Sequence, residues 1–157
     1  MTSTQAPTTT HQQLYDTDFI EWIAQTAELL KRGEFSELDI TNLIEEVEDW
    51  GRSQKQALKS NLRVLLMHLL KWQYQHRKRS GSWRGSWRGS IVEHRQRIQD
   101  ALEDSPSLKN YYSSVLADSY ATAREIAVHE TGFSLDTFPA ECSYTAEKVL
   151  DSEFLPE

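Results

Sequence analysis

The residues that could do chemistry in this chain are polar side chains at positions where a helical pattern predicts burial. Glu45 and Glu46 lie in an acidic stretch that also carries an apolar stripe. His68 and Lys71 lie beside the apolar face of the strongest helical segment, and Arg95 interrupts an apolar row. A positioned carboxylate can act as a general base, so one hypothesis is a catalytic or ligand site with Glu46 as base and His68 or Lys71 as its partner.

The same residues also fit a structural network, which is the interpretation that we favour. A guanidinium buried alone is costly, so Arg95 is expected to meet a carboxylate, with Glu45 or Glu46 the first choice. Together with His68, such a network would fix the register of the helices.

The sequence offers little for a metal ion or cofactor. Metal sites in helical bundles use Glu-x-x-His pairs, and none occurs here. Glu125 and His129 have a ligand-compatible spacing, but a solvated pair on a helix is the more common arrangement. Neither an H-E-x-x-H motif nor a phosphate-binding glycine loop is present, and Cys142 has no base beside it in the sequence. We therefore expect no metal and no cofactor.

A basic segment is the second candidate site. Between Lys71 and Arg97 there are eight basic residues and one acid, so this segment carries +7 in a chain whose net charge is −7. It holds a tandem repeat, Ser82-Trp-Arg-Gly85 followed by Ser86-Trp-Arg-Gly89. The predicted contact residues are Arg77, Lys78, Arg79, Trp83, Arg84, Trp87 and Arg88.

Three interpretations of this basic segment stay open. Its tryptophans could fold back on the core as part of a solvated loop. Its Trp and Arg side chains could bind an acidic protein, because both types are enriched at interface hot spots. They could also bind single-stranded nucleic acid, with the cations on phosphates and the indoles stacked on bases.

Composition and length set the class of protein. A chain of 157 residues with 38% hydrophobic and 26% charged residues is a soluble globular chain of one domain's length. We expect a disordered tail over residues 1–13 and a single helical domain over residues 14–157. The single cysteine excludes an intrachain disulfide framework, and without an apolar leader or membrane span the expected location is cytoplasmic.

One helix organises the predicted fold. From Ala57 to Tyr74 apolar residues recur at steps of four and three, and further apolar residues occupy its other faces, so other helices must wrap it. No stretch resembles a strand. We predict an all-α bundle of about six helices around this central one.

The neighbouring segments complete the predicted bundle. Residues 39–50 form a second helix. Gly51 either ends this helix or bends it into the central helix, and we favour a bend with the helix resuming by Ser53. Residues 82–89 form a loop because of their glycines, and Ser90 caps the next helix. The buried stripe predicted for the second helix consists of Ile40, Leu43, Ile44, Val47 and Trp50.

Nine short motifs are spread along the chain. They are Tyr15-Asp-x-Asp-Phe19-x-x-Trp22, Glu45-Glu46, Gly51-Arg-Ser53, His68-Leu-Leu-Lys-Trp72, Ser-Trp-Arg before Ile91-x-x-x-Arg95, Ser105-Pro-Ser-Leu108, Tyr120-x-x-Ala123, Phe138-Pro139 and Cys142-x-Tyr144. Taken together, these motifs resemble the family catalogued as domain of unknown function number 29. The resemblance covers roughly Leu14 to Pro156 and implies a helical fold, a bacterial and often cyanobacterial cytoplasmic setting, and no established activity. The family usually shows one Ser-Trp element where this chain has two, and Ser143 stands where the family often places proline.

The function that the sequence favours is a non-catalytic protein-interaction or regulatory module. Its expected contact surface is the basic Trp/Arg segment over residues 77–89, facing a protein partner with an acidic surface. One alternative is an enzyme or a metal- or ligand-binding site built on Glu45, Glu46, His68, Lys71 and Arg95. The other is single-stranded nucleic-acid binding through the basic Trp/Arg segment over residues 77–89.

Overall fold

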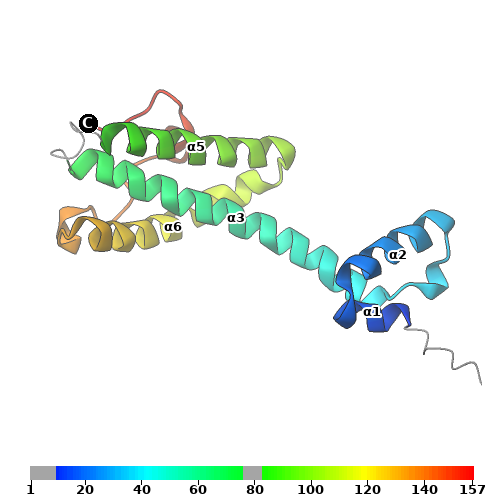
Figure 1. Ribbon diagram of the computed structural model, residues 1–157. Coiled ribbons are helices and arrows are strands. Elements are labelled where there is room, and N and C mark those ends of the chain that lie inside the picture. The colour runs from blue at the N-terminus through cyan, green and yellow to red at the C-terminus, as the bar shows by residue number, and fades with distance from the viewer. Residues whose placement is uncertain (1–9, 76–82) are drawn as a thin grey trace, which may run out of the picture. The chain divides into compact units, whose positions relative to one another are not determined.

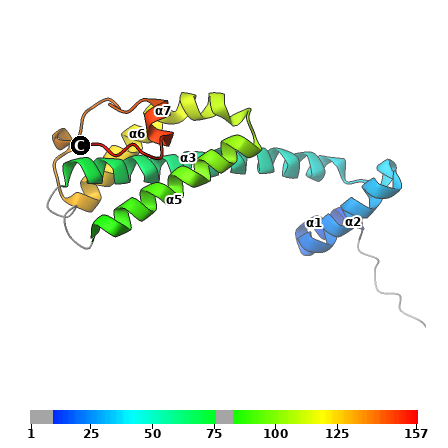
Figure 2. The ribbon, with the colours of Figure 1, turned by 90° about the horizontal axis from the view of Figure 1, so that it is seen from above.

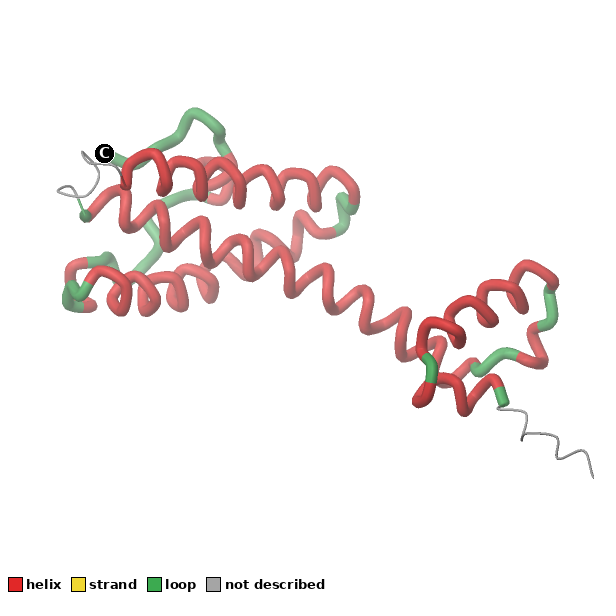
Figure 3. The backbone as a smooth tube through the Cα atoms, in the orientation of Figure 1, coloured by secondary structure: helices red, strands yellow, loops and turns green. Residues whose placement is uncertain are grey.

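A computed structural model describes residues 10–75 and 83–157, with the side chains of Trp83 and Arg84 outside the description. Over these residues the protein is all helical, and Figures 1 and 3 show no strand. The α-helices are α1 (His11–Thr17), α2 (Phe19–Arg32), α3 (Ile40–Tyr74), α5 (Trp83–Asp104), α6 (Leu108–Thr131) and α7 (Ala146–Leu150). The all-α prediction is therefore confirmed. None of these helices has the length and hydropathy that crossing a bilayer requires.

The chain divides into two compact units, Met1–Arg52 and Ser53–Glu157. The N-terminal unit holds α1, α2, the short 3₁₀ helix η1 (Phe35–Glu37) and the first residues of α3. Asp18 begins α2 by accepting a hydrogen bond from the backbone of Glu21, and Gly33 ends it in a left-handed conformation. The predicted division into a tail over residues 1–13 and one domain over residues 14–157 stays a prediction. Helix α1 begins at His11, ahead of residue 14, and residues 1–9 lie outside the description.

The predicted central helix is the second part of α3, and it forms the core of the C-terminal unit. Six of its leucines expose 1% of their surface or less, and Trp72 exposes 5%. They pack in one apolar cluster with side chains of α5, α6 and the C-terminal segment (Figures 1 and 2). The buried leucines are Leu58, Leu62, Leu65, Leu66, Leu69 and Leu70.

Two local predictions are wrong. Helix α3 continues through Gly51, where a bend was expected, because neighbours on both sides sustain the helix and one interior glycine costs only about 1 kcal/mol. Helix α5 begins at Trp83, so the segment predicted as a loop up to Gly89 is helical from that residue. Trp87 and Ile91 lie one turn apart in the core, and their burial offsets the low helix propensity of Gly85 and Gly89.

The backbone conformations of Gly51, inside α3, and Gly132, at the end of α6, predict opposite effects of substitution by alanine. A Cβ at Gly51 meets no atom within 4 Å, so Gly51→Ala should raise the free energy of unfolding by about 0.5–1 kcal/mol. Gly132→Ala should lower it by about 1 kcal/mol, because Gly132 ends α6 with φ +73°. Urea denaturation followed by circular dichroism measures both. A loss of stability in Gly51→Ala would show that α3 does not pass through residue 51 as a regular helix.

Candidate functional site

The predicted polar residues belong to two compact units: Glu45 and Glu46 to the N-terminal unit, and His68, Lys71 and Arg95 to the C-terminal unit. In the N-terminal unit Glu45 is exposed, and the carboxylate of Glu46 accepts a hydrogen bond of 2.7 Å from the Tyr15 hydroxyl. This hydrogen bond, with desolvation and nearby carboxylates, raises the pKa of Tyr15 to about 12. Glu46 thus links α1 to α3 within this unit.

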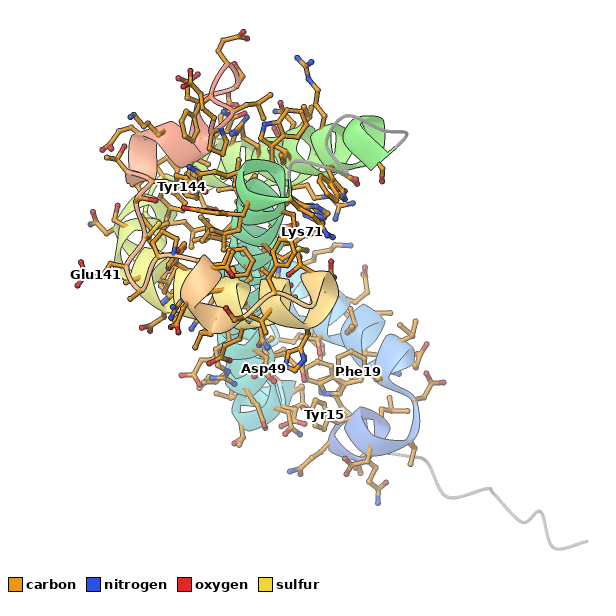
Figure 4. The ribbon with its side chains drawn as sticks, turned by 90° about the vertical axis from the view of Figure 1, so that its left-hand side faces the viewer. Tyr15, Phe19, Asp49, Lys71, Glu141 and Tyr144 are labelled. Atoms are coloured by element: carbon orange, nitrogen blue, oxygen red, sulfur yellow. The ribbon has the colours of Figure 1, made fainter. Side chains whose placement is uncertain are left out.

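An aromatic cluster surrounds that hydrogen bond. The ring of Tyr15 meets Phe19 and Trp22 edge-on, at centroid distances of 5.8 and 5.1 Å, and Figure 4 shows Tyr15 and Phe19 together. His11 stacks on Trp22 at 5.8 Å and hydrogen-bonds to the Thr26 hydroxyl at 3.0 Å. Trp22 and Thr26, exposed by 2% and 5%, are the buried side chains of α2. This cluster is the core of the N-terminal unit.

Arg95 is buried as predicted, but the prediction that it meets a carboxylate is wrong. Its side chain is 2% exposed, and its guanidinium donates to three backbone carbonyls of the C-terminal segment. The distances are 2.8 Å to Val149, 3.5 Å to Ser152 and 3.0 Å to Phe154. A planar fork of N–H donors satisfies several oxygens at once, so Arg95 fixes this segment on α5.

His68 and Lys71 have structural neighbours in the C-terminal unit. Lys71 forms an ion pair of 2.5 Å with Glu130 of α6 and lies 5.2 Å from the ring of Trp87 (Figure 4 labels Lys71). Burial, and then the charge of Lys71, lower the pKa of His68 to about 4, so its imidazole is neutral at pH 7. Glu130 was not foreseen, because no local spacing signals a partner 59 residues away.

The three catalytic candidates therefore have different surroundings: Glu46 accepts a hydrogen bond from Tyr15, Lys71 pairs with Glu130, and His68 is partly buried. Glu46 belongs to the N-terminal unit, and His68, Lys71 and Arg95 belong to the C-terminal unit. Neither unit by itself therefore contains both Glu46, the predicted general base, and His68, its predicted partner. Burial raises the pKa of the Cys142 thiol, which contacts the carbonyl of Tyr144. Over the described residues no three His, Cys, Asp or Glu side chains are grouped so that they could hold a metal ion.

Most of the contact residues predicted in the basic segment lie outside the described residues. Arg77, Lys78 and Arg79 belong to the stretch that is not described, as do the side chains of Trp83 and Arg84. Trp87 is 3% exposed, so the prediction that its indole faces a partner is wrong: the ring packs in the core beneath Lys71. Arg88 is exposed. Binding of an acidic protein or of nucleic acid through the remaining residues stays a prediction.

The N-terminal unit presents a feature that the sequence did not lead us to expect. Eleven large apolar side chains are exposed in the described parts of the chain, and nine of them belong to this unit. The stripe predicted to be buried on α3 is exposed at Ile40, Ile44, Val47 and Trp50, by 48–70%. We call these nine residues the N-terminal apolar surface: Phe19, Ile20, Ile23, Leu30, Phe35, Ile40, Ile44, Val47 and Trp50.

The same unit also carries an acidic groove of about 570 Å³. It is lined by one side of α2 together with His11 and residues of η1 and its flank. Four carboxylates border it, from Glu21, Glu28, Glu34 and Glu37, and Arg32 is its only cationic lining residue. The Nδ1 atom of His11 is buried without a hydrogen-bond partner.

The chain belongs to a family with no assigned activity. Residues 14–155 match the family described as Domain of unknown function DUF29. Neither the curated proteins nor the solved structures gave a match. The motif residues Tyr15, Phe19, Trp22 and Glu46 form the aromatic cluster of the N-terminal unit. In the C-terminal unit, Tyr144 donates a hydrogen bond of 2.6 Å to Gln73 (Figure 4). These motif positions thus hold the fold together.

The three carbonyl contacts predict a structural role for Arg95. Arg95→Met should lower the free energy of unfolding by about 2–3 kcal/mol, because three carbonyls lose a charged donor. Arg95→Lys should recover only part of this, since one ammonium cannot reproduce the fork. Arg97→Ala is the control: its ion pair with Glu93 is more than half exposed and contributes at most about 0.5 kcal/mol. Equal losses at Arg95 and Arg97 in urea denaturation would contradict this assignment.

The lowered pKa of His68 predicts a dependence of stability on pH. The unfolded chain binds a proton at this residue near pH 6.5, and the folded chain binds it only near pH 4. Stability should therefore fall as the pH drops through this window, because protons favour the unfolded state. His68→Gln should flatten that part of the profile of melting temperature against pH, whereas His129→Gln, at an exposed position of α6, should not. Identical profiles for the wild type and His68→Gln would refute the shift.

Proposed function

We propose that this protein is a non-catalytic protein-interaction module that binds through the N-terminal apolar surface. The observation that carries the proposal is the concentration of exposed apolar side chains in one unit. Ile20, Phe35 and Val47 expose 75%, 63% and 61% of their surface. Single exposed apolar residues are ordinary, but a group of nine within one small unit is typical of an interaction surface.

The periodicity of these residues supports the proposal. On α3, Ile40, Ile44 and Val47 follow the i, i+4, i+7 spacing of a helix face that is buried against another element. On α2, Phe19, Ile23 and Leu30 follow a similar spacing. A solvated helix face has no need for such a stripe. The pattern is therefore explained by burial against something other than the N-terminal unit itself.

The polar candidates also favour binding over catalysis. Glu46 is engaged by Tyr15, Arg95 by backbone carbonyls and Lys71 by Glu130. These contacts account for residues that an enzyme hypothesis would use as base or acid. Phe19 packs on Tyr15 and Trp22 in the core of the unit, whereas Ile40, Ile44 and Val47 remain exposed on α3.

Site-specific crosslinking tests the proposal. A photoreactive amino acid at position 44, in full-length protein added to a native lysate, should crosslink to a protein, and one at position 92 should not. Position 92 is the matched control because Val92 is 55% exposed on α5 of the C-terminal unit. Crosslinking at both positions alike, or at neither, would contradict the proposal.

The double variant Ile44→Glu/Val47→Glu gives the second arm. Because both residues are exposed, the melting temperature should change little, within the ±0.5 kcal/mol that is usual for surface substitutions. Crosslinking from a third position on the surface, residue 23, should be lost in this variant and kept in Val92→Glu. A large loss of stability would show that the chain itself covers these residues, and the proposal would then be wrong.

A further inference from the structure

The chemistry around the N-terminal apolar surface identifies the kind of partner that fits it. On α3, with about 100° per residue, Ile40, Ile44 and Val47 fall within about 60° of one another. Further around the helix lie Glu48, Glu45 and Asp49, with Thr41 and Arg52 between Glu48 and Glu45, and all five are exposed. Three carboxylates and one cation, Arg52, therefore border the apolar stripe on one side. On the other side Leu43 is half-buried, and Glu46 is already engaged by Tyr15.

The N-terminal unit is acidic and its cations are already paired. Residues 1–52 contain eleven acids and three bases, a net charge of −8. Lys31 pairs with Glu28 at 2.8 Å, Arg32 lies 3.6 Å from Glu34, and Arg52 pairs with Asp49 and Glu48. The Lys and Arg residues of the unit's described part are therefore each paired with an acid, and its acids outnumber them. A partner with Lys or Arg beside its apolar residues complements this surface.

A second copy of this chain does not meet these requirements. A symmetric contact would bring together two N-terminal units, each with a net charge of −8, and their repulsion disfavours self-association. The basic segment between Lys71 and Arg97 has the complementary charge, but its contact with the N-terminal unit of another copy would be heterologous. Heterologous contacts generate open chains unless their rotation closes a ring. A different protein is the simpler occupant.

We infer that the N-terminal apolar surface binds a basic amphipathic helix of another protein, an inference that rests on the function proposed above. The partner's apolar residues, spaced three and four apart, pack on Ile40, Ile44 and Val47. Its flanking Lys and Arg side chains lie against the row of Glu45, Glu48 and Asp49. A helix suits this surface because the exposed apolar residues of α3 form a stripe along one helix. Amphipathic helices commonly bind by laying their apolar face on such a surface.

Three fluorescent peptides of about 18 residues, or five helical turns, test the inference with the full-length chain. The first has Leu on one face and Lys elsewhere, the second has the same Leu face with Glu in place of Lys, and the third is the first in scrambled order. Fluorescence anisotropy should show the Lys amphipathic peptide binding at least about tenfold more tightly than the other two. Its affinity should fall with added salt, because screening weakens the charge contacts.

Charge reversal and surface variants locate the contact. Glu45→Lys/Glu48→Lys should weaken binding of the Lys peptide and strengthen binding of the Glu peptide, a reversal that a general loss of structure cannot produce. Glu103→Lys/Asp104→Lys, at exposed residues of α5, is the matched control and should leave the preference unchanged. Ile44→Glu/Val47→Glu should abolish binding, whereas Val92→Glu should keep it.

The outcomes separate this inference from the proposed function. If the Glu amphipathic peptide binds as tightly as the Lys peptide, and Ile44→Glu/Val47→Glu abolishes both, the surface docks helices but the basic partner is wrong. If the scrambled Lys peptide binds equally well, the interaction is unspecific attraction and the inference fails. If no peptide binds and light scattering shows a dimer that Ile44→Glu/Val47→Glu dissociates, a second copy covers the surface and the inference is overturned.

Discussion

The C-terminal unit depends on covering the second part of α3. Six leucines of this segment lose almost all contact with water, and each such burial is worth roughly 1.5–3 kcal/mol. Because they are distributed around the helix, one neighbour cannot cover them. Helix α5 therefore has to run along α3 from Trp87 to Leu102, helix α6 has to supply another side, and the C-terminal segment closes the remainder. Arg95 holds that segment in place through hydrogen bonds to three of its carbonyls. The burial of α3 therefore also determines where Arg95 and these carbonyls lie.

The two parts of α3 show how far periodicity can predict a fold. The pattern of Leu58, Leu62, Leu65 and Leu69 predicted a buried central helix, and the structure confirms it. The pattern of Ile40, Ile44 and Val47 has the same spacing, yet these residues are exposed. The spacing of apolar residues indicates which face of a helix is suited to burial. It does not indicate whether that face packs against the same chain or against another protein. In the described part of the N-terminal unit, α1, α2 and η1 accompany α3, and the buried side chains of α2 pack around Trp22 rather than on this stripe.

The candidate site was less predictable than the fold because its contacts are distant in sequence or involve the backbone. Burial of Arg95 followed from its place in an apolar row. Its partners did not, since a backbone carbonyl has no residue type to recognise. Glu46 was expected to act as a base or to pair with Arg95, whereas the structure shows its carboxylate accepting a hydrogen bond from the Tyr15 hydroxyl. Trp87 was assigned to a loop because glycines flank it, and the apolar contacts of α5 outweighed their low helix propensity.

Charge gives the last constraint on what this protein binds. Acidic residues are concentrated in the N-terminal unit and basic residues between Lys71 and Arg97, so the chain's overall charge of −7 conceals two surfaces with opposite preferences. Apolar burial supplies affinity without selecting the partner, whereas a bordering row of carboxylates rejects acidic helices and attracts basic ones. In the N-terminal unit both features lie on neighbouring faces of one helix. We propose that this combination of a non-selective apolar stripe and a selective charged border lets the N-terminal unit recognise one class of partner.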